Sequence, residues 1–150
     1  MEGHSFDCKK VWIIRVDPGE DVLLSIRNFI SQNGIKQGIV VMGYGTLSKV
    51  SMHWVTHNQF PPSNRYEKWE DGIEILSLNG IVVDGEPHIH FTASTSSGAF
   101  GGHMEEGCIC YVLCEIGFIE VDGANMTRDY VPIATDSEGN PVKRPQLRFS

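Results

Sequence analysis

The chain has 150 residues, of which 41% are hydrophobic and 21% charged, an ordinary composition for a single globular domain. It carries 12 Lys and Arg against 19 Asp and Glu, a formal net charge of −7, and its basic residues form no stripe, which argues against duplex DNA as the main ligand. No apolar run approaches the length of a membrane span and the amino terminus lacks a signal-peptide pattern, so we expect a cytoplasmic protein with no membrane partner.

The first third of the chain predicts a strand, a helix and an interrupted strand. Residues 10–17 are rich in β-branched and aromatic side chains, which favours a strand. Residues 20–32 place apolar side chains at the i, i+3, i+4, i+7 spacing of an amphipathic helix. Residues 38–48 predict a buried strand, in which Gly43 and Gly45 mark a bulge or a place where a ligand or another backbone comes close.

The rest of the chain predicts mostly strands. Residues 50–56, 73–78 and 108–121 have strand-like patterns, whereas residues 123–150 are rich in Gly, Pro, Asp and Asn and are expected to be irregular. We interpret His53 as an ordinary sheet or surface histidine, with a role as a further ligand or base as the alternative. One helix among several long strands predicts an α+β fold, with a mixed, largely antiparallel sheet packed against one main helix.

Three of the four cysteines, Cys108, Cys110 and Cys114, share one strand-like run. A CxC pair with no second pair elsewhere is a poor zinc signature. We interpret these residues as small core side chains, with a redox role as the distant alternative.

The strongest functional signal is a group of three histidines. His88 and His90 are two residues apart in an alternating run, so both imidazoles leave the same face of a strand. His103 follows thirteen residues after His90, and a turn at residues 96–98 returns the chain so that His103 can lie beside the pair. Three imidazoles around an open fourth position suit zinc, and less selectively another divalent transition metal.

Alternatives to a metal site remain open at this point. Histidines at i and i+2 also occur on ordinary solvated strand faces. Glu74 lies among apolar neighbours, and we interpret it either as a solvated or ion-paired strand residue, or as a catalytic carboxylate near the metal that accepts a proton. Gly101 and Gly102 are expected to let a ligand approach the backbone.

Four segments, taken in order, resemble the PPC domain, the plant and prokaryote conserved domain: RVDPGEDVLLSI, GIEILSLNG, PHIHF and GGHMEEGCICYVLCEI. The resemblance predicts an amino-terminal extension at residues 1–9, a PPC-like domain at 10–122 and an irregular tail at 123–150. The chain is similar to the stand-alone prokaryotic type, often labelled predicted DNA-binding because the plant domain follows an AT-hook. No Arg-Gly-Arg-Pro core of an AT-hook occurs in this chain.

The resemblance implies an α+β fold that assembles as a homotrimer. It also implies that prokaryotic members can carry a metal, which in this chain would fall on His88, His90 and His103. Residues 71–76 resemble the interaction motif of the plant domain, Gly-Arg-Phe-Glu-Ile-Leu; Glu74 matches that motif, and its arginine has no counterpart here.

Two classes of function follow from these observations. In the first, the protein holds zinc with three histidines and binds or acts on a small molecule at the open position, with Glu74 as the proton acceptor. In the second, it is a DNA-binding or protein-interaction module in which metal and trimer are structural. A fourth protein ligand to the metal would favour the second class, because structural zinc sites are usually closed.

Overall fold

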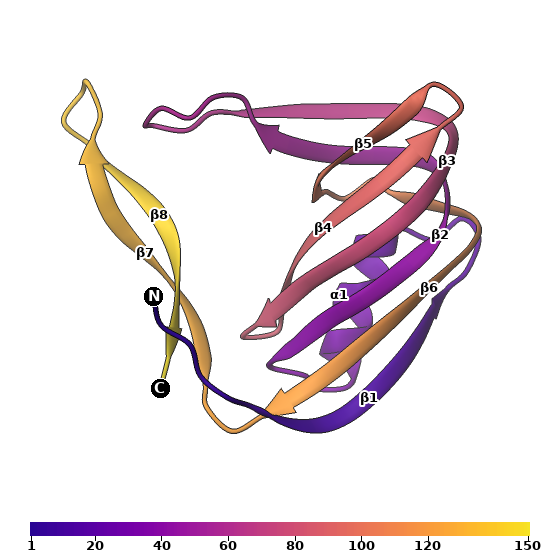
Figure 1. Ribbon diagram of the computed structural model, residues 1–150, viewed down its shortest axis with the longest axis horizontal. Helices are drawn as coiled ribbons and strands as arrows, with labels where there is room; N and C mark the ends of the chain where they lie inside the picture. The colour runs from indigo at the N-terminus through magenta and orange to yellow at the C-terminus, as the bar shows by residue number, and fades with distance from the viewer.

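The protein was analysed as a computed structural model that describes residues 1–150. Its elements in chain order are β1 (Asp7–Val16), α1 (Val22–Gln32), β2 (Gly38–Val55), β3 (Asn64–Val83), β4 (Glu86–Thr95), β5 (Gly98–Met104), β6 (Ile109–Asp122), β7 (Met126–Thr135) and β8 (Pro141–Phe149). Six strands form one sheet in the order β1-β6-β2-β3-β4-β5, and β7 and β8 form a separate hairpin (Figure 1). The fold is therefore mostly sheet with one short helix, in agreement with the predicted single helix among long strands.

Every strand pairing is antiparallel, which confirms the largely antiparallel sheet that the sequence predicted, and no parallel pairing makes it mixed. β1 and β2 both pair with β6 and therefore run parallel to each other, and the crossover between them contains α1. None of the protein's helices has the length and apolar content that crossing a membrane requires.

The sheet closes on itself at one end. One edge of β2 pairs with β3, and its other edge pairs first with β6 and then with β5, at Met52 and His53. Since β3 pairs with β4 and β4 with β5, these four strands form a closed ring of pairings. Consequently β2, β5 and β4 lie side by side at this end of the molecule.

Helix α1 begins and ends with capping contacts. The Asp21 carboxylate accepts a hydrogen bond from the Leu24 backbone N–H at 3.1 Å, which satisfies one of the unpaired amides of the first turn. The side chain and backbone amides of Asn33 both donate to the carbonyl of Phe29 at the other end. The helix then buries Ile26 and Ile30 against the sheet, as the apolar spacing predicted.

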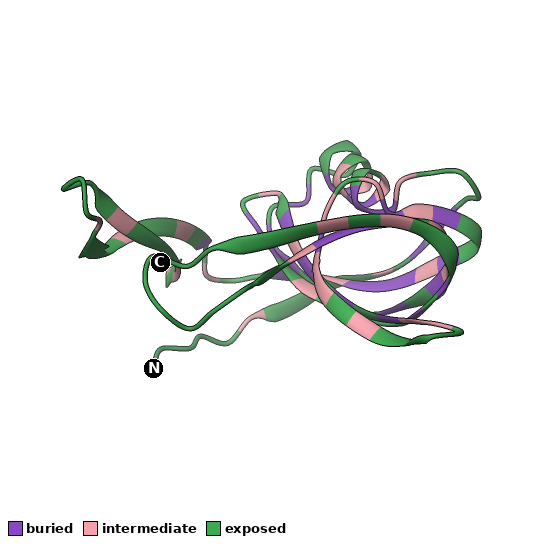
Figure 2. Ribbon diagram, turned by 90° about the horizontal axis from the view of Figure 1, so that it is seen from above, coloured by how far each residue is buried: buried purple, intermediate pink, exposed green.

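The core lies between α1 and the inner face of the curved sheet. Figure 2 shows the buried residues concentrated there, while the β7–β8 hairpin is almost entirely at the surface. Phe118 of β6 and Leu47 of β2 are both fully buried within this core of 24 buried residues. Burial of this kind stabilises by roughly 1.5–3 kcal/mol per large apolar side chain.

The glycines of β2 mark the close approach that their position predicted. Gly45 has φ +148°, and a Cβ atom at this residue would lie 2.2 Å from the carbonyl oxygen of Leu113. The register between β2 and β6 shifts directly after it, between Gly45 and Leu47. Gly45 therefore belongs to a β-bulge at which β6 comes too near for any side chain.

The carboxyl-terminal segment is not irregular, and that prediction was wrong. Residues 126–149 form the antiparallel hairpin of β7 and β8, joined by a turn. The Asp136 carboxylate accepts hydrogen bonds from the backbone N–H groups of Glu138 and Asn140, and Gly139 has φ +87°. Some of the turn-forming residues that made the segment seem irregular lie in this tight turn, and the others lie before the hairpin or within its strands.

Candidate metal centre

His53, His103 and His90 form a row across the neighbouring strands β2, β5 and β4. The strand register pairs His53 of β2 with His103 of β5, and His103 with His90 of β4. Adjacent strands lie about 4.8 Å apart, so imidazoles at paired positions on one face come into contact. His88 lies two residues before His90 on β4 and therefore on the same face. The structure thus brings together His88, His90 and His103, the three residues that the sequence singled out.

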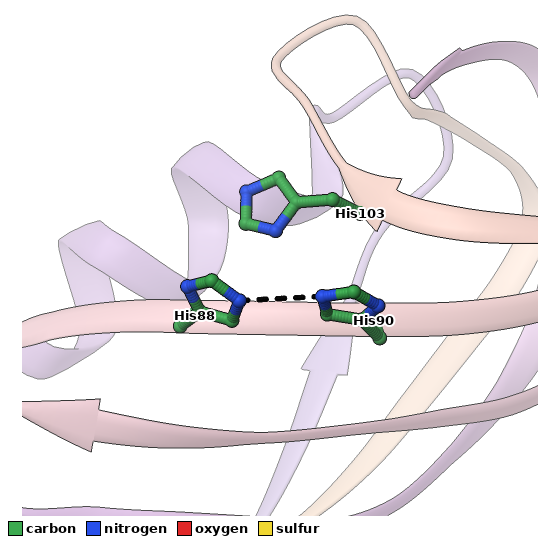
Figure 3. Close-up of side chains that lie close together, drawn as sticks. All are labelled: His88, His90 and His103. Atoms are coloured by element: carbon green, nitrogen blue, oxygen red, sulfur yellow. Dashed lines mark hydrogen bonds between the residues drawn. The ribbon is translucent and has the colours of Figure 1, made fainter. Parts of the chain in front are cut away.

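The three imidazoles face one another (Figure 3). The Nε2 atoms of His88 and His90 are 3.2 Å apart. The ring centroid of His103 lies 4.5 Å from that of His88 and 5.3 Å from that of His90. One nitrogen from each of the three rings lies within 4.8 Å of the others. Two nitrogens bound to one tetrahedral zinc at about 2.0–2.1 Å are separated by roughly 3.3 Å, close to the observed His88–His90 distance.

The site favours the neutral form of these imidazoles, which is the form that binds metal. Burial, together with the charges of His88 and His53, lowers the pKa of His103 to about 4. The pKa values of His88 and His90 are also lowered, chiefly by burial; Arg128 and His53 contribute at His88, and His53 contributes at His90. Their lone pairs are therefore available at neutral pH.

His103 also carries an unsatisfied polar atom. Its Nδ1 is buried and has no hydrogen-bond partner. A buried polar atom without a partner costs about 1–3 kcal/mol and calls for an explanation such as an ion. The clustered neutral nitrogen donors and this unpartnered atom fit a divalent transition metal of the zinc type.

A second group lies beside these histidines: the sequence reasoning gave His53 a ligand role only as an alternative, and it missed Glu105. His53 Nδ1 and Glu105 Oε1 are hydrogen-bonded at 2.6 Å, and the ring centroid of His53 lies 4.6 Å from that of His103. Glu105 follows His103 by two residues, and this spacing was the available signal. His53 had no local signal, because its pairing with β5 depends on how the sheet closes.

The structure does not bring Glu74 to the histidines. Glu74 pairs with Ser94, which is four residues beyond His90 on β4 and hence about 13 Å along the strand. Its side chain is exposed and lines a groove with Thr46 and Tyr111. Of the two interpretations drawn from the sequence, the solvated strand face describes Glu74, and a position beside the metal does not.

Gly101 and Gly102 are explained by strand packing. A Cβ atom on Gly101 would lie 2.6 Å from the carbonyl oxygen of Phe91, and one on Gly102 would lie 2.7 Å from that of His53. Both contacts are with neighbouring strands rather than with space for a ligand. The two glycines therefore let β5 fit between β4 and β2, which is what places His103 in the row.

Comparison with known proteins gives one family match. A sequence model of the Plants and Prokaryotes Conserved (PCC) domain matches residues 3–122. Among curated proteins, the bifunctional protein GlmU of Synechococcus sp. (strain JA-3-3Ab) is 28% identical over 109 residues, which is 71% of this chain and 16% of that protein. The chain thus spans only about a sixth of the length of the curated relatives it matches.

Solved structures share the fold. A plant- and prokaryote-conserved protein from Pyrococcus horikoshii is 28% identical, with a TM-score of 0.73 and coverage of 96% of this chain and 97% of that one. A metal-containing protein from Archaeoglobus fulgidus is 22% identical, with a TM-score of 0.74 and coverage of 95% and 97%. A protein from Bacteroides thetaiotaomicron, named as a candidate DNA-binding protein, is 19% identical, with a TM-score of 0.70 and coverage of 93% and 96%.

Proposed function

We propose that this chain, which belongs to the Plants and Prokaryotes Conserved (PCC) domain family, is a metal-binding protein. His88, His90 and His103 hold one divalent transition metal ion, zinc by preference. The observation that carries this proposal is the mutual approach of three neutral imidazoles, with His103 Nδ1 buried and unpartnered. The metal-containing relative from Archaeoglobus fulgidus supports the assignment at the level of the fold.

The site binds a small molecule at the position that the three histidines leave open. Zinc held by three imidazoles supplies Lewis acidity, which polarises a carbonyl group or lowers the pKa of water. His88 and His90 line one side of the site from β4, and His103 lines the other side from the neighbouring strand β5. Small-molecule binding ranks ahead of a DNA-associated role, because the net charge of −7 opposes the binding of DNA phosphates. Three histidines also leave the coordination sphere of the metal ion incomplete, so that a small molecule can enter it.

The protein also self-associates, as the homotrimer that the sequence resemblance implies. Large apolar side chains exposed on neighbouring strands of the sheet support this part of the proposal, because large exposed apolar patches mark interaction surfaces. They come from three adjacent strands, β1, β6 and β2: Val11, Ile13, Ile39, Val41, Met42, Tyr44, Tyr111, Val112 and Leu113.

Metal retention tests the proposed function. After dialysis against zinc and then against metal-free buffer, the wild-type protein is expected to retain zinc by elemental analysis, and His103→Ala is expected to retain none. His57→Ala is the matched control, because His57 is an exposed histidine bonded to Ser63 outside the site. Zinc absent from the wild type, or retained equally by His103→Ala, would contradict the proposal.

A further inference from the structure

We propose that the histidine cluster is a two-ion centre, with a second cation position formed by His53, Glu105 and His103. His103 then bridges the two ions through its two ring nitrogens. The inference rests on the proposed function for the first ion and adds the second ion and its ligands.

The second position has a ligand set of its own. One donor atom each from His53, His103 and Glu105 lies within 4.8 Å of the other two. His53 Nδ1 and Glu105 Oε1 already lie 2.6 Å apart. Their side chains are 19% and 32% exposed, so both are partly withdrawn from water and still accessible to an ion. Two imidazoles and one carboxylate are a ligand set that zinc accepts.

The two ligand sets share a single residue, His103. The two nitrogens of an imidazole lie on different sides of the ring. In Figure 3 one ring nitrogen of His103 faces the His88–His90 pair, and the other lies on the side of the ring away from them. His53 approaches His103 in register from the opposite strand, β2, at a ring separation of 4.6 Å. One ring can therefore serve both positions.

Two anionic groups would offset part of the charge of two ions. His88, His90 and His53 are neutral ligands, and Glu105 brings one negative charge to the second position. When His103 binds both ions, its ring N–H proton leaves to solvent, and the ring itself becomes a negatively charged ligand. Two dications are thus held by two anionic groups and three neutral imidazoles.

In sites with a single metal ion, a carboxylate also commonly accepts a hydrogen bond from a histidine that binds the ion. In that arrangement the supported histidine is itself a ligand of the ion. Here His53 is grouped with His103 and Glu105, and the His88–His90–His103 group forms without it. This division of the donors favours a second ion over support for the first.

Zinc stoichiometry tests the inference. Metal-free protein is titrated with Zn²⁺ and its bound zinc is measured by elemental analysis and by calorimetry. The wild type is expected to bind two ions per chain. His53→Ala and Glu105→Gln are each expected to bind one, His88→Ala to bind one, and His103→Ala to bind none. His57→Ala is expected to bind two, and circular dichroism checks that every variant is folded.

Copper gives an independent readout of the bridge. With two Cu²⁺ per chain, the integrated electron paramagnetic resonance signal is expected to fall well below the copper content, because two ions joined by one imidazole couple magnetically. A saturating stoichiometry of one ion in the wild type, unchanged in His53→Ala, would overturn the second position and leave the first intact. One ion that is lost in His53→Ala would also overturn it, since His53 would then be a ligand of the single ion. No bound metal in any protein would instead refute the proposed function.

Discussion

At the scale of single residues, the buried thiols in and directly before β6 form a pH-sensitive part of the core. Cys108, Cys110 and Cys114 are each at most 1% exposed, which confirms their interpretation as small core side chains. Burial raises the pKa of Cys108 to about 11 and that of Cys114 to about 12. The Cys108 thiol donates a hydrogen bond to the carbonyl of Ser51 at 3.2 Å, so it is held in its protonated form.

The raised pKa values predict a loss of stability at alkaline pH. The folded-state pKa of Cys114 exceeds its ordinary value of 9.0, so above pH 9 the unfolded chain releases a proton that the folded chain keeps. Stability from this thiol is complete below pH 9 and is lost as the pH rises toward 12, at up to about 1.4 kcal/mol per pH unit. Urea titrations at pH 8 and pH 10 give the fall in the free energy of unfolding between the two pH values. We expect this fall to be smaller in Cys114→Ala than in the wild type, by roughly 1 kcal/mol.

Cys8 provides the control for this prediction. It is exposed, and Cys8→Ala is expected to show the same fall in unfolding free energy as the wild type. Cys114→Ala is less stable at neutral pH because it leaves a cavity, so only the change with pH is compared. Equal pH dependence in the wild type and Cys114→Ala would contradict the prediction.

The candidate site shows which residues a sequence can identify. His88, His90 and His103 were found from local spacing, because alternation within a strand and a short hairpin fix their positions. His53 is 50 residues from His103 in the chain, and only the closure of β2 onto β5 pairs them. The two interpretations of Glu74 stayed open for the same reason, since its distance from His90 depends on the register of β3 against β4.

At the scale of elements, the sequence predicts the elements that a local residue pattern marks. The helix followed from its apolar spacing, and the bulge of β2 followed from Gly45. The hairpin of β7 and β8 was missed because most of its residues are exposed, which leaves no alternating apolar pattern to indicate a strand. The pairing of β7 with β8 maintains most of that element, and burial contributes at its base.

One buried side chain holds the base of this hairpin. Gln37 is 8% exposed; its Nε2 donates to the carbonyl of Ala124 at 2.9 Å, and its Oε1 accepts from the backbone N–H of Met126. Met126 packs beside this contact against Val83 and Val121. The glutamine therefore fixes the point at which the chain passes from the main sheet into β7.

Gln37→Ala is expected to loosen the hairpin while the main sheet stays folded. The change leaves two backbone groups without their partner, at a cost of about 1–3 kcal/mol for the pair. Hydrogen exchange measured by mass spectrometry is expected to become about tenfold or more faster in residues 126–149 and to stay unchanged in α1. Gln59→Ala, at an exposed loop residue, is the control. Unchanged exchange in the hairpin would contradict this role of Gln37.

At the scale of the whole molecule, one row of apolar side chains on the sheet stays exposed in the single chain. The registers place Val11, Ile119, Ile39 and Ile81 side by side across β1, β6, β2 and β3. Val11, Ile39 and Ile81 are exposed, and Ile119 is partly exposed. Such a row on the side opposite the core is unfavourable in water, so contact with a second copy of the chain would stabilise it.

The proposed homotrimer makes Ile39 a sensitive position, because it lies at the centre of this row. Light scattering coupled to gel filtration is expected to give three times 16.7 kDa for the wild type and a smaller mass for Ile39→Lys, since a buried lysine ammonium without a partner is costly. Leu24→Lys is a closely matched control: Leu24 is 40% exposed, as is Ile39, but lies on α1. A monomeric wild type would refute the trimer, and an equal mass for wild type and Ile39→Lys would exclude this row from its interface.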